Sequence, residues 1–242
     1  MSVLSIGCGP LPERKRGALP LFGCGEVLEA VQEPVRHNTL RRWAQEAVPN
    51  FAFFVGAWRW IAVEPLDEKR PAPLELSRKE VGLFRPTAAN AQLWAEVVAQ
   101  ANACSARGVL LRSPPAFTPS ATNLDNLRRF RAEIIGETCL ELVWEPRGIW
   151  QREELLALGE ELGFTIAIDP HLDARLPDAI DGPAYYTVTA PPGRLRFSED
   201  DLYDLTEFCA AHEGEVRVMF RGPDRETNAR AFARAAGIEA AG

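Results

Sequence analysis

The residues from Leu140 to Pro170 decide the fold class, because they contain a strand, a helix and a second strand in succession. Leu140-Glu-Leu-Val-Trp144 is a short, mainly apolar run, and so is Thr165-Ile-Ala-Ile168. Between them, Gln151–Leu162 carries leucines at three- and four-residue spacing, which is typical of an amphipathic helix. This order predicts two parallel strands that are joined by a crossover helix.

The same alternation extends over the rest of the chain. Six more apolar runs predict strands, namely Val3–Gly7, Val27–Val31, Phe51–Gly56, Val109–Leu111, Ala184–Val188 and Val216–Phe220. Further helices are expected over Thr39–Ala47, Thr87–Arg107 and Ser198–His212, with Thr39, Thr87, Ser198 and Thr227 as candidate caps. Strands that alternate with helices pair in parallel, because each return of the chain uses a helix.

Eight strands in 242 residues favour one α/β domain, a single TIM-like (β/α) barrel over residues 1–242. An open doubly wound parallel sheet is the alternative. It is less favoured, because Gly7-Cys-Gly-Pro10 lacks the third glycine of a dinucleotide-binding turn. The Pro-rich residues 64–86 are expected to form a long loop after the third strand, on the face where barrel sites lie.

Composition and charge exclude several classes of protein. The net charge is −7, which disfavours a nucleic-acid partner. No run of about 18 apolar residues occurs, so we expect no membrane span, no secretory leader and a cytoplasmic location. The five cysteines form no Cys-x-x-Cys pair, and Cys139 and Cys209 are expected to be buried as small apolar residues.

Four groups of motifs occur in a characteristic order. They are Leu40-Arg-Arg-Trp43 with Phe51–Ile61, Ser113-Pro-Pro-Ala-Phe117 with Asn123-Leu124, Leu142-Val-Trp-Glu-Pro-Arg-Gly-Ile-Trp150, and Ile168-Asp-Pro170. Together they resemble the YecE-like family, a domain of unknown function (DUF72) with a TIM-barrel-type fold. The resemblance spans roughly residues 27–236 and implies the barrel fold and an arginine at the position of Arg147.

The chain departs from that family over much of the polar barrel mouth. Of a Glu-x-Asn-Ser-Thr-Phe-Tyr-like run only Glu29 is kept, and Gly56 stands where the family has a lysine. Tyr186-Thr-Val-Thr-Ala190 replaces a Tyr-x-Arg-x-His-Gly-like run, and Phe220-Arg-Gly222 replaces Phe-Asn-Asn. The chain is therefore identified as a divergent member, with either a different ligand or a lost activity.

Residues at the carboxyl ends of barrel strands converge on one pocket. Glu145 and Asp169, after the fifth and sixth strands, are the candidate catalytic acid and base. The candidate ligand-binding residues are Glu29, Trp58, Arg59, Arg147, Trp150, His171 and Arg221. Arginine forks bind carboxylate or phosphate bidentately, so the expected ligand is a small anion.

Two interpretations of this cluster stay open. Strand parity directs Asp169 toward the barrel axis, and Arg147 is expected to anchor the ligand. Alternatively, Glu145 and Arg147 form an ion pair that ties a loop to the barrel. Pro114 and Pro115 are expected to form a rigid turn at the mouth.

No cofactor or metal site stands out. The chain has three histidines and no His-x-His or His-Glu-x-x-His pair, so a divalent metal at Asp169-Pro-His171 is not favoured. A nucleotide-binding motif and a Gly-x-Ser-x-Gly nucleophile are also missing from the sequence.

The sequence therefore predicts a barrel protein that binds a small anionic ligand at its mouth. Two carboxylates beside arginines could serve hydrolase or lyase chemistry, and whether the chain is an enzyme stays open. The alternative is a non-catalytic binding or scaffold protein that has kept the barrel and lost the polar mouth. Nucleic-acid processing by a metal-dependent barrel is disfavoured by the charge and the few histidines.

Overall fold

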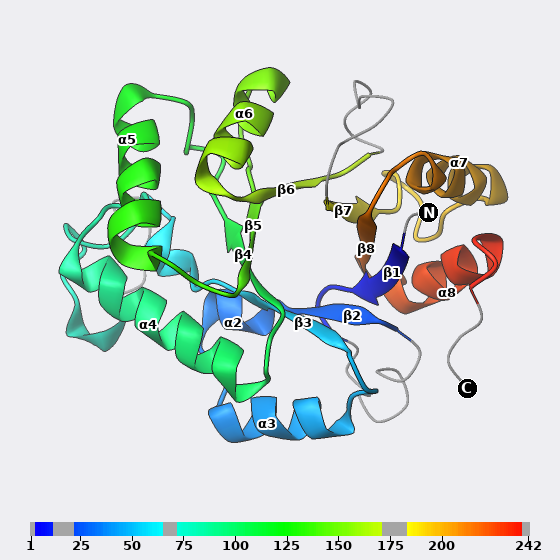
Figure 1. Ribbon diagram of the computed structural model, residues 1–242, viewed down its shortest axis with the longest axis horizontal. Helices are drawn as coiled ribbons and strands as arrows, with labels where there is room; N and C mark the ends of the chain where they lie inside the picture. Colours follow the sequence, from blue (N-terminus) through cyan, green and yellow to red (C-terminus); the bar gives the residue numbers. More distant parts are fainter. Residues whose placement is uncertain (1–2, 12–21, 65–71, 171–182, 239–242) are drawn as a thin grey trace. The chain divides into compact units, whose positions relative to one another are not determined.

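The computed structural model describes residues 3–11, 22–64, 72–170 and 183–238 (Figure 1). Eight parallel strands follow the chain order from β1 to β8 around a closed barrel, and this confirms the predicted α/β barrel and excludes the open sheet. The strands are β1 (Val3–Cys8), β2 (Cys24–Val27), β3 (Ala52–Gly56), β4 (Gly108–Arg112), β5 (Glu141–Glu145), β6 (Thr165–Ile168), β7 (Ala184–Thr189) and β8 (Glu215–Arg221).

Helices follow β2, β3, β4, β5, β7 and β8 along the described chain. They are α2 (Glu29–Gln32), α3 (His37–Glu46), α4 (Ala88–Ala103), α5 (Ala121–Arg129), α6 (Arg152–Leu162), α7 (Glu199–Ala210) and α8 (Arg225–Ala235). Short 3-10 turns occur at η2 (Arg59–Ile61) and η3 (Pro73–Glu75), and a π-helical turn, η4 (Phe130–Ile135), continues α5. Residues 72–86, the described end of the expected Pro-rich loop, contain η3 and no strand.

The internal contacts of the chain divide it into two compact units. Unit 1 comprises Met1–Leu28, Arg42–Phe54 and Ala167–Gly242, and unit 2 comprises Glu29–Arg41 and Val55–Ile166. The boundaries fall within β3 and β6, so each of these strands contributes residues to both units.

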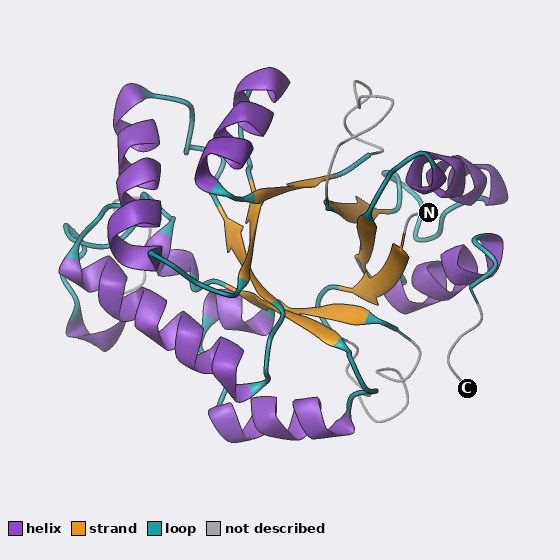
Figure 2. Ribbon diagram, viewed as in Figure 1, coloured by secondary structure: helices purple, strands orange, loops and turns teal. Residues whose placement is uncertain are grey.

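In unit 1, α8 packs on β1 and β8, and α7 packs beside α8 (Figure 2). The alternate residues Val216, Val218 and Phe220 of β8 are fully buried, and Phe220 contacts Phe232 of α8 with ring centroids 5.5 Å apart. Ser198 begins α7 with a complete capping box, because its side chain accepts from the Asp201 N–H while the Asp201 carboxylate accepts from the Ser198 N–H. This cap was expected from the sequence.

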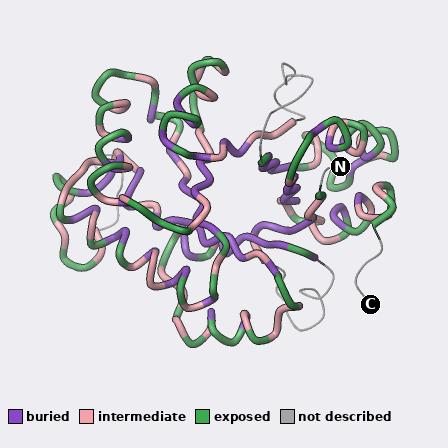
Figure 3. Tube along the Cα trace, viewed as in Figure 1, coloured by how far each residue is buried: buried purple, intermediate pink, exposed green. Residues whose placement is uncertain are grey.

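In unit 2, the strands are buried along most of their length, and α4 buries the face that contacts β4 (Figure 3). Thr87 caps α4 as expected, since its side chain accepts from the Asn90 N–H. Ile166 of β6 lies against Gly159 of α6, where an added Cβ would be 2.9 Å from the isoleucine side chain. Ile166 of β6 therefore faces α6.

Three local expectations are wrong. The predicted strand Val27–Val31 is instead the last residue of β2 followed by α2, because a short apolar run fits a buried helical turn as well as a strand. Thr39 and Thr227 lie inside α3 and α8, which begin two residues earlier than these threonines, so neither occupies the position of a cap.

None of the helices within the described ranges combines the length and the apolar character that crossing a bilayer requires.

The cysteines differ sharply in burial. Cys8, Cys24, Cys104 and Cys209 are buried, whereas Cys139 is exposed, so the expectation that Cys139 is buried is wrong and that for Cys209 is confirmed. Burial raises the pKa of Cys8, Cys104 and Cys209 to about 12 and raises that of Cys24 as well, because a thiolate is poorly solvated in the interior. Disulfide-free and protonated, the four buried thiols are poor nucleophiles.

We therefore expect iodoacetamide at neutral pH to add one label to the folded chain, at Cys139, and five labels in urea. Intact-mass spectrometry measures both numbers, and Cys139→Ser should leave the folded protein unlabelled. Rapid labelling of a second thiol in the folded state would contradict this assignment.

A buried polar pair lies between β7 and the end of α7. The Tyr186 hydroxyl is hydrogen-bonded to Nε2 of His212 at 2.6 Å, both residues are buried, and the half-buried Phe208 ring contacts both of their rings. A buried polar atom that loses its partner carries a desolvation cost.

Tyr186→Phe should lower the free energy of unfolding by about 1–3 kcal/mol, because it removes the hydroxyl from a buried imidazole nitrogen. Urea denaturation followed by circular dichroism measures the change. The matched control is Tyr203→Phe at an exposed position of α7, which should change stability by less than about 0.5 kcal/mol. Equal effects of the two substitutions would contradict a structural role for the pair.

Candidate functional site

Unit 2 contains a polar cavity of about 280 Å³ at the carboxyl ends of its strands. We call it the arginine pocket, and its lining consists of Val31, Gln32, Arg59, Val63, Arg112, Ser113, Pro114, Pro115 and Arg147. Two of these residues, Arg59 and Arg147, were expected at a ligand site, and Pro114 and Pro115 were expected to shape its mouth. The pocket therefore brings together part of the predicted cluster.

Neighbouring strands explain why these residues meet. Arg112 is the last residue of β4, Arg59 begins η2 shortly after β3, and Arg147 follows the end of β5 by two residues. The Ala57 N–H donates to the Leu110 carbonyl at 2.8 Å, which joins the chain after β3 to β4. Carboxyl ends of parallel strands lie at one edge of a sheet, so their following residues converge.

An ion pair between neighbouring strands uses the carboxylate of Glu145. Arg112 and Glu145 are direct register partners in β4 and β5. Nη2 of Arg112 donates to Oε1 of Glu145 at 3.1 Å, and Nε lies 3.0 Å from Oε2 without the alignment of a hydrogen bond. The expected alternative, a Glu145–Arg147 ion pair, is thus replaced by a Glu145–Arg112 pair.

Ser113 places a buried hydroxyl on the wall of the arginine pocket. The residue is only 1% exposed, and its Oγ accepts hydrogen bonds from Nε1 of Trp144 and from the Arg147 N–H, each at 3.3 Å. A hydroxyl has two acceptor positions and one proton to donate. Both acceptor positions are occupied, and the hydroxyl proton has no acceptor among the residues that the structure describes.

Arg147 has a fixed backbone and an exposed guanidinium. Its N–H is bonded to Ser113, and the next residue, Gly148, has φ +129° and approaches Pro115 so closely that an added Cβ would lie 2.6 Å from the Pro115 carbonyl oxygen. Only glycine fits this approach. In the described part of the chain the Arg147 guanidinium makes no hydrogen bond or ion pair, so its fork is available to a ligand.

Arg59 and Gln32 also line the arginine pocket and contact each other. Nη1 of Arg59 donates to the Gln32 side-chain oxygen at 3.2 Å, and Nε1 of Trp58 donates to the Gln32 carbonyl at 3.1 Å. Trp58 is buried and is not part of the pocket lining, so its position is that of a packing residue that holds the end of α2.

Unit 1 holds a different cluster, around a carboxylate that is completely buried. Oε1 of Glu26 accepts from the Tyr185 hydroxyl at 2.9 Å and from Nη2 of Arg221 at 2.7 Å, and Oε2 accepts from Nε of Arg221 at 2.9 Å. A Cβ at Gly9 would lie 1.7 Å from Oε2, so a larger residue there would displace the Glu26 carboxylate. Burial and the nearby Glu26 charge raise the pKa of Tyr185 well above its usual value, which keeps the phenol a donor.

Arg221 was expected to bind a ligand, and the structure assigns its fork to Glu26 instead. A buried carboxylate without a cation is strongly destabilising, so the bidentate contact satisfies a local electrostatic demand. Glu26 lies inside β2 rather than after its end, so it was not among the residues expected at the site. A lone acid between Gly25 and Val27 in an otherwise apolar strand was the available signal.

The remaining predicted residues are placed as follows. Glu29 is exposed in the first turn of α2 rather than at the end of a strand, which corrects its expected position. Asp169 directly follows β6 and is half-buried, in unit 1 rather than in the unit of Glu145. His171 lies outside the described residues.

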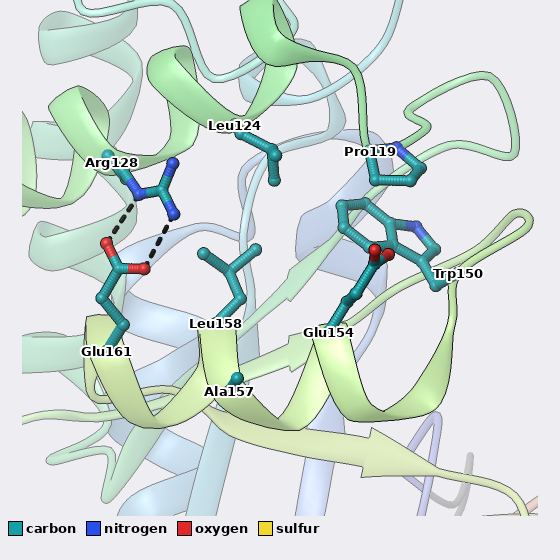
Figure 4. Close-up of a pocket in the computed structure, with 8 residues that line it drawn as sticks. All are labelled: Pro119, Leu124, Arg128, Trp150, Glu154, Ala157, Leu158 and Glu161. Carbon is teal, nitrogen blue, oxygen red and sulfur yellow. Dashed lines mark hydrogen bonds and ion pairs between the residues drawn. The ribbon is translucent and has the colours of Figure 1, made fainter.

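Trp150 lines a second cavity of about 270 Å³ in unit 2, between α5 and α6 (Figure 4). We call it the α5–α6 pocket. Its lining consists of Pro119, Leu124, Arg128, Trp150, Glu154, Ala157, Leu158 and Glu161. Trp150 is therefore not part of the arginine pocket, where the sequence pattern had placed it.

Among residues 3–11, 22–64, 72–170 and 183–238, no group of three or more histidine, cysteine, aspartate or glutamate side chains is arranged to hold a metal ion.

No protein-family model and no curated protein matches this sequence. Solved structures do. A DUF72 family protein (EF0366) from Enterococcus faecalis V583 is 12% identical, with a TM-score of 0.72 over 98% of this chain and 96% of that chain. A second structure of EF0366 gives 15% identity and a TM-score of 0.71, covering 99% of both chains.

A DUF72 family protein (TM1631) from Thermotoga maritima MSB8 is 16% identical, with a TM-score of 0.61 over 98% of this chain and 97% of that chain. The fold is thus a TIM-type barrel of the kind found in DUF72 proteins. The resemblance to the YecE-like family is confirmed at the level of the fold.

Arg221→Ala should lower the free energy of unfolding by about 3–5 kcal/mol, because it leaves the buried Glu26 carboxylate without a cation. Adding Glu26→Gln should recover part of this loss, since the uncompensated charge is then removed. Arg196→Ala is the control: it removes an exposed arginine from Asp224 and should cost less than about 1 kcal/mol. Chemical denaturation measures all three, and an Arg221→Ala effect no larger than the control would contradict the structural role.

Proposed function

We propose that the chain binds a small oxyanion, such as a carboxylate or phosphate group, in the arginine pocket. The observation that carries this proposal is the Arg147 guanidinium, which lines the cavity and has no side-chain partner within the described ranges. Glu145 forms an ion pair with Arg112, and no carboxylate on the described lining neutralises Arg147. A bidentate oxyanion fits the guanidinium fork in geometry and charge.

Ser113 supports an oxygen-bearing ligand in particular. Its hydroxyl accepts from two N–H donors and so keeps one proton to donate, and Ser113 lines the pocket in which an oxygen-bearing ligand would accept that proton. The same arrangement argues against Ser113 as a nucleophile, because both lone-pair positions accept hydrogen bonds and no described base contacts the hydroxyl. Ser113 would thus select ligands that accept a hydrogen bond.

Binding without catalysis is the function we favour for this pocket. Glu145 was expected to act as a general acid or base, yet it is the counter-ion that positions Arg112. Hydrolase or lyase chemistry at Glu145 or at Asp169 stays a second proposal, to be tested by turnover in Glu145→Gln and in Asp169→Asn separately. We also propose that residues 1–242 form a single divergent DUF72-type domain, because β3 and β6 each contribute to both units.

Thermal-shift and calorimetric titrations with inorganic phosphate, sulfate and malonate test the binding proposal, since a ligand of the folded state raises the melting temperature. Arg147→Ala should weaken binding of the tightest-binding anion by about 10–100-fold, because the charge-assisted contact of the guanidinium fork is lost. Its melting temperature in the absence of anion should be unchanged. The anion affinity of Arg147→Lys should lie between those of the wild type and Arg147→Ala, because lysine keeps the charge and loses the bidentate geometry.

Arg129→Ala provides the matched control, since Arg129 is an exposed arginine of α5 that pairs with Glu133 and lies outside the pocket. It should leave anion binding unchanged. A large fall in the anion-free melting temperature for both Arg147 variants would show a structural brace and overturn the proposal. So would anion binding that is equal in Arg147→Ala and Arg129→Ala.

A further inference from the structure

The α5–α6 pocket has an apolar floor and one aromatic side. Leu124 of α5 and Leu158 of α6 face each other across it, and Pro119 and the Trp150 indole close one end (Figure 4). Trp150 is itself held in place by an edge-to-face contact with Trp144, with ring centroids 5.2 Å apart. The indole is therefore a fixed wall rather than a freely rotating side chain.

The charges at the two ends of the pocket differ. At one end Arg128 and Glu161 form a bidentate ion pair, with Nε–Oε1 and Nη2–Oε2 distances of 2.6 and 2.8 Å, so that end is neutral. This hydrogen-bonded pairing lowers the pKa of Glu161 and raises that of Arg128. At the other end the Glu154 carboxylate has no hydrogen-bond or ion-pair partner in the described chain.

Glu154 and Trp150 place negative potential in the same space. Figure 4 shows the Glu154 side chain rising from α6 toward the indole. The face of an indole ring carries the negative part of its quadrupole, and it attracts cations. A carboxylate beside such a face complements a positive group, and the leucine floor complements an apolar body attached to it.

We propose that the α5–α6 pocket binds a small organic cation, an alkyl- or aryl-ammonium whose charged nitrogen lies between Glu154 and Trp150 and whose apolar part contacts Leu124 and Leu158. This site is separate in lining and opposite in ligand charge from the arginine pocket. The two proposals can therefore fail independently.

A purely local role for Glu154 makes a different prediction. Glu153 and Glu154 both lie in the first turn of α6, where negative charge stabilises the helix dipole. Both residues are exposed, but Glu154 alone of the two lines the pocket. Glu153→Gln is consequently a matched control for Glu154→Gln, because the two changes remove the same charge from the same helical turn.

The experiment is a titration of the intact chain with benzylammonium chloride at pH 7, with benzyl alcohol as the uncharged comparison. The probe signal is the Trp150 indole N–H in ¹H–¹⁵N NMR spectra, assigned with Trp150→Phe. We expect saturable shifts of this signal with benzylammonium and binding at least about fivefold weaker for benzyl alcohol. Glu154→Gln should reduce benzylammonium affinity to that of the alcohol, and Glu153→Gln should leave it unchanged.

Several results would overturn the proposal. Equal affinity for benzylammonium and benzyl alcohol would show a merely apolar groove, and an unmoved Trp150 signal at saturating concentration would show that the pocket is not a site. Equal losses of benzylammonium affinity in Glu153→Gln and Glu154→Gln would show that the effect comes from the negative charge of the helical turn rather than from a contact in the pocket. Melting temperatures of the two variants check folding, and they are expected to fall by the same small amount.

Discussion

The register of β4 against β5 is the constraint from which the arginine pocket follows. It places Arg112 directly opposite Glu145, and the resulting ion pair occupies the carboxylate that stands nearest to Arg147 in the sequence. A shift of one residue would turn every side chain of the strand to the other face and dissolve this pairing. The same register places Ser113, the next residue, where its hydroxyl accepts from Trp144 and from the backbone of Arg147.

Charges in the two units are used in different ways. In unit 1 the Glu26 carboxylate is fully buried and is satisfied by Arg221 and Tyr185, so the charges there are consumed within the fold. The ion pair in this cluster is explained by the free energy that a buried charge without a partner would cost, and it needs no ligand. In unit 2 the exposed Arg147 guanidinium and Glu154 carboxylate have no described partner of their own. Both binding proposals rest on this difference, since each of these two charges lines a cavity and is not paired with another described residue.

One short segment contributes to both the arginine pocket and the α5–α6 pocket. Between the end of β5 and the start of α6, Arg147 lines the arginine pocket and Trp150 lines the α5–α6 pocket. Gly148 makes this division feasible, because its positive φ and its close approach to Pro115 turn the chain between the two. Ile149, at the same turn, is 82% exposed, so it takes no part in the packing that fixes its neighbours.

The sequence by itself determined the barrel, most strand positions and the identity of Arg59 and Arg147 as residues near strand ends. Those features depend on hydrophobic periodicity, which is a local pattern, and on the parallel topology that follows from strands alternating with helices. The structure alone showed that Glu145 pairs with Arg112, that Arg221 is committed to Glu26, and that Trp150 faces another cavity. Each partner lies at least 33 residues away or on another element, and only strand register and side-chain packing decide which of several nearby charges meet.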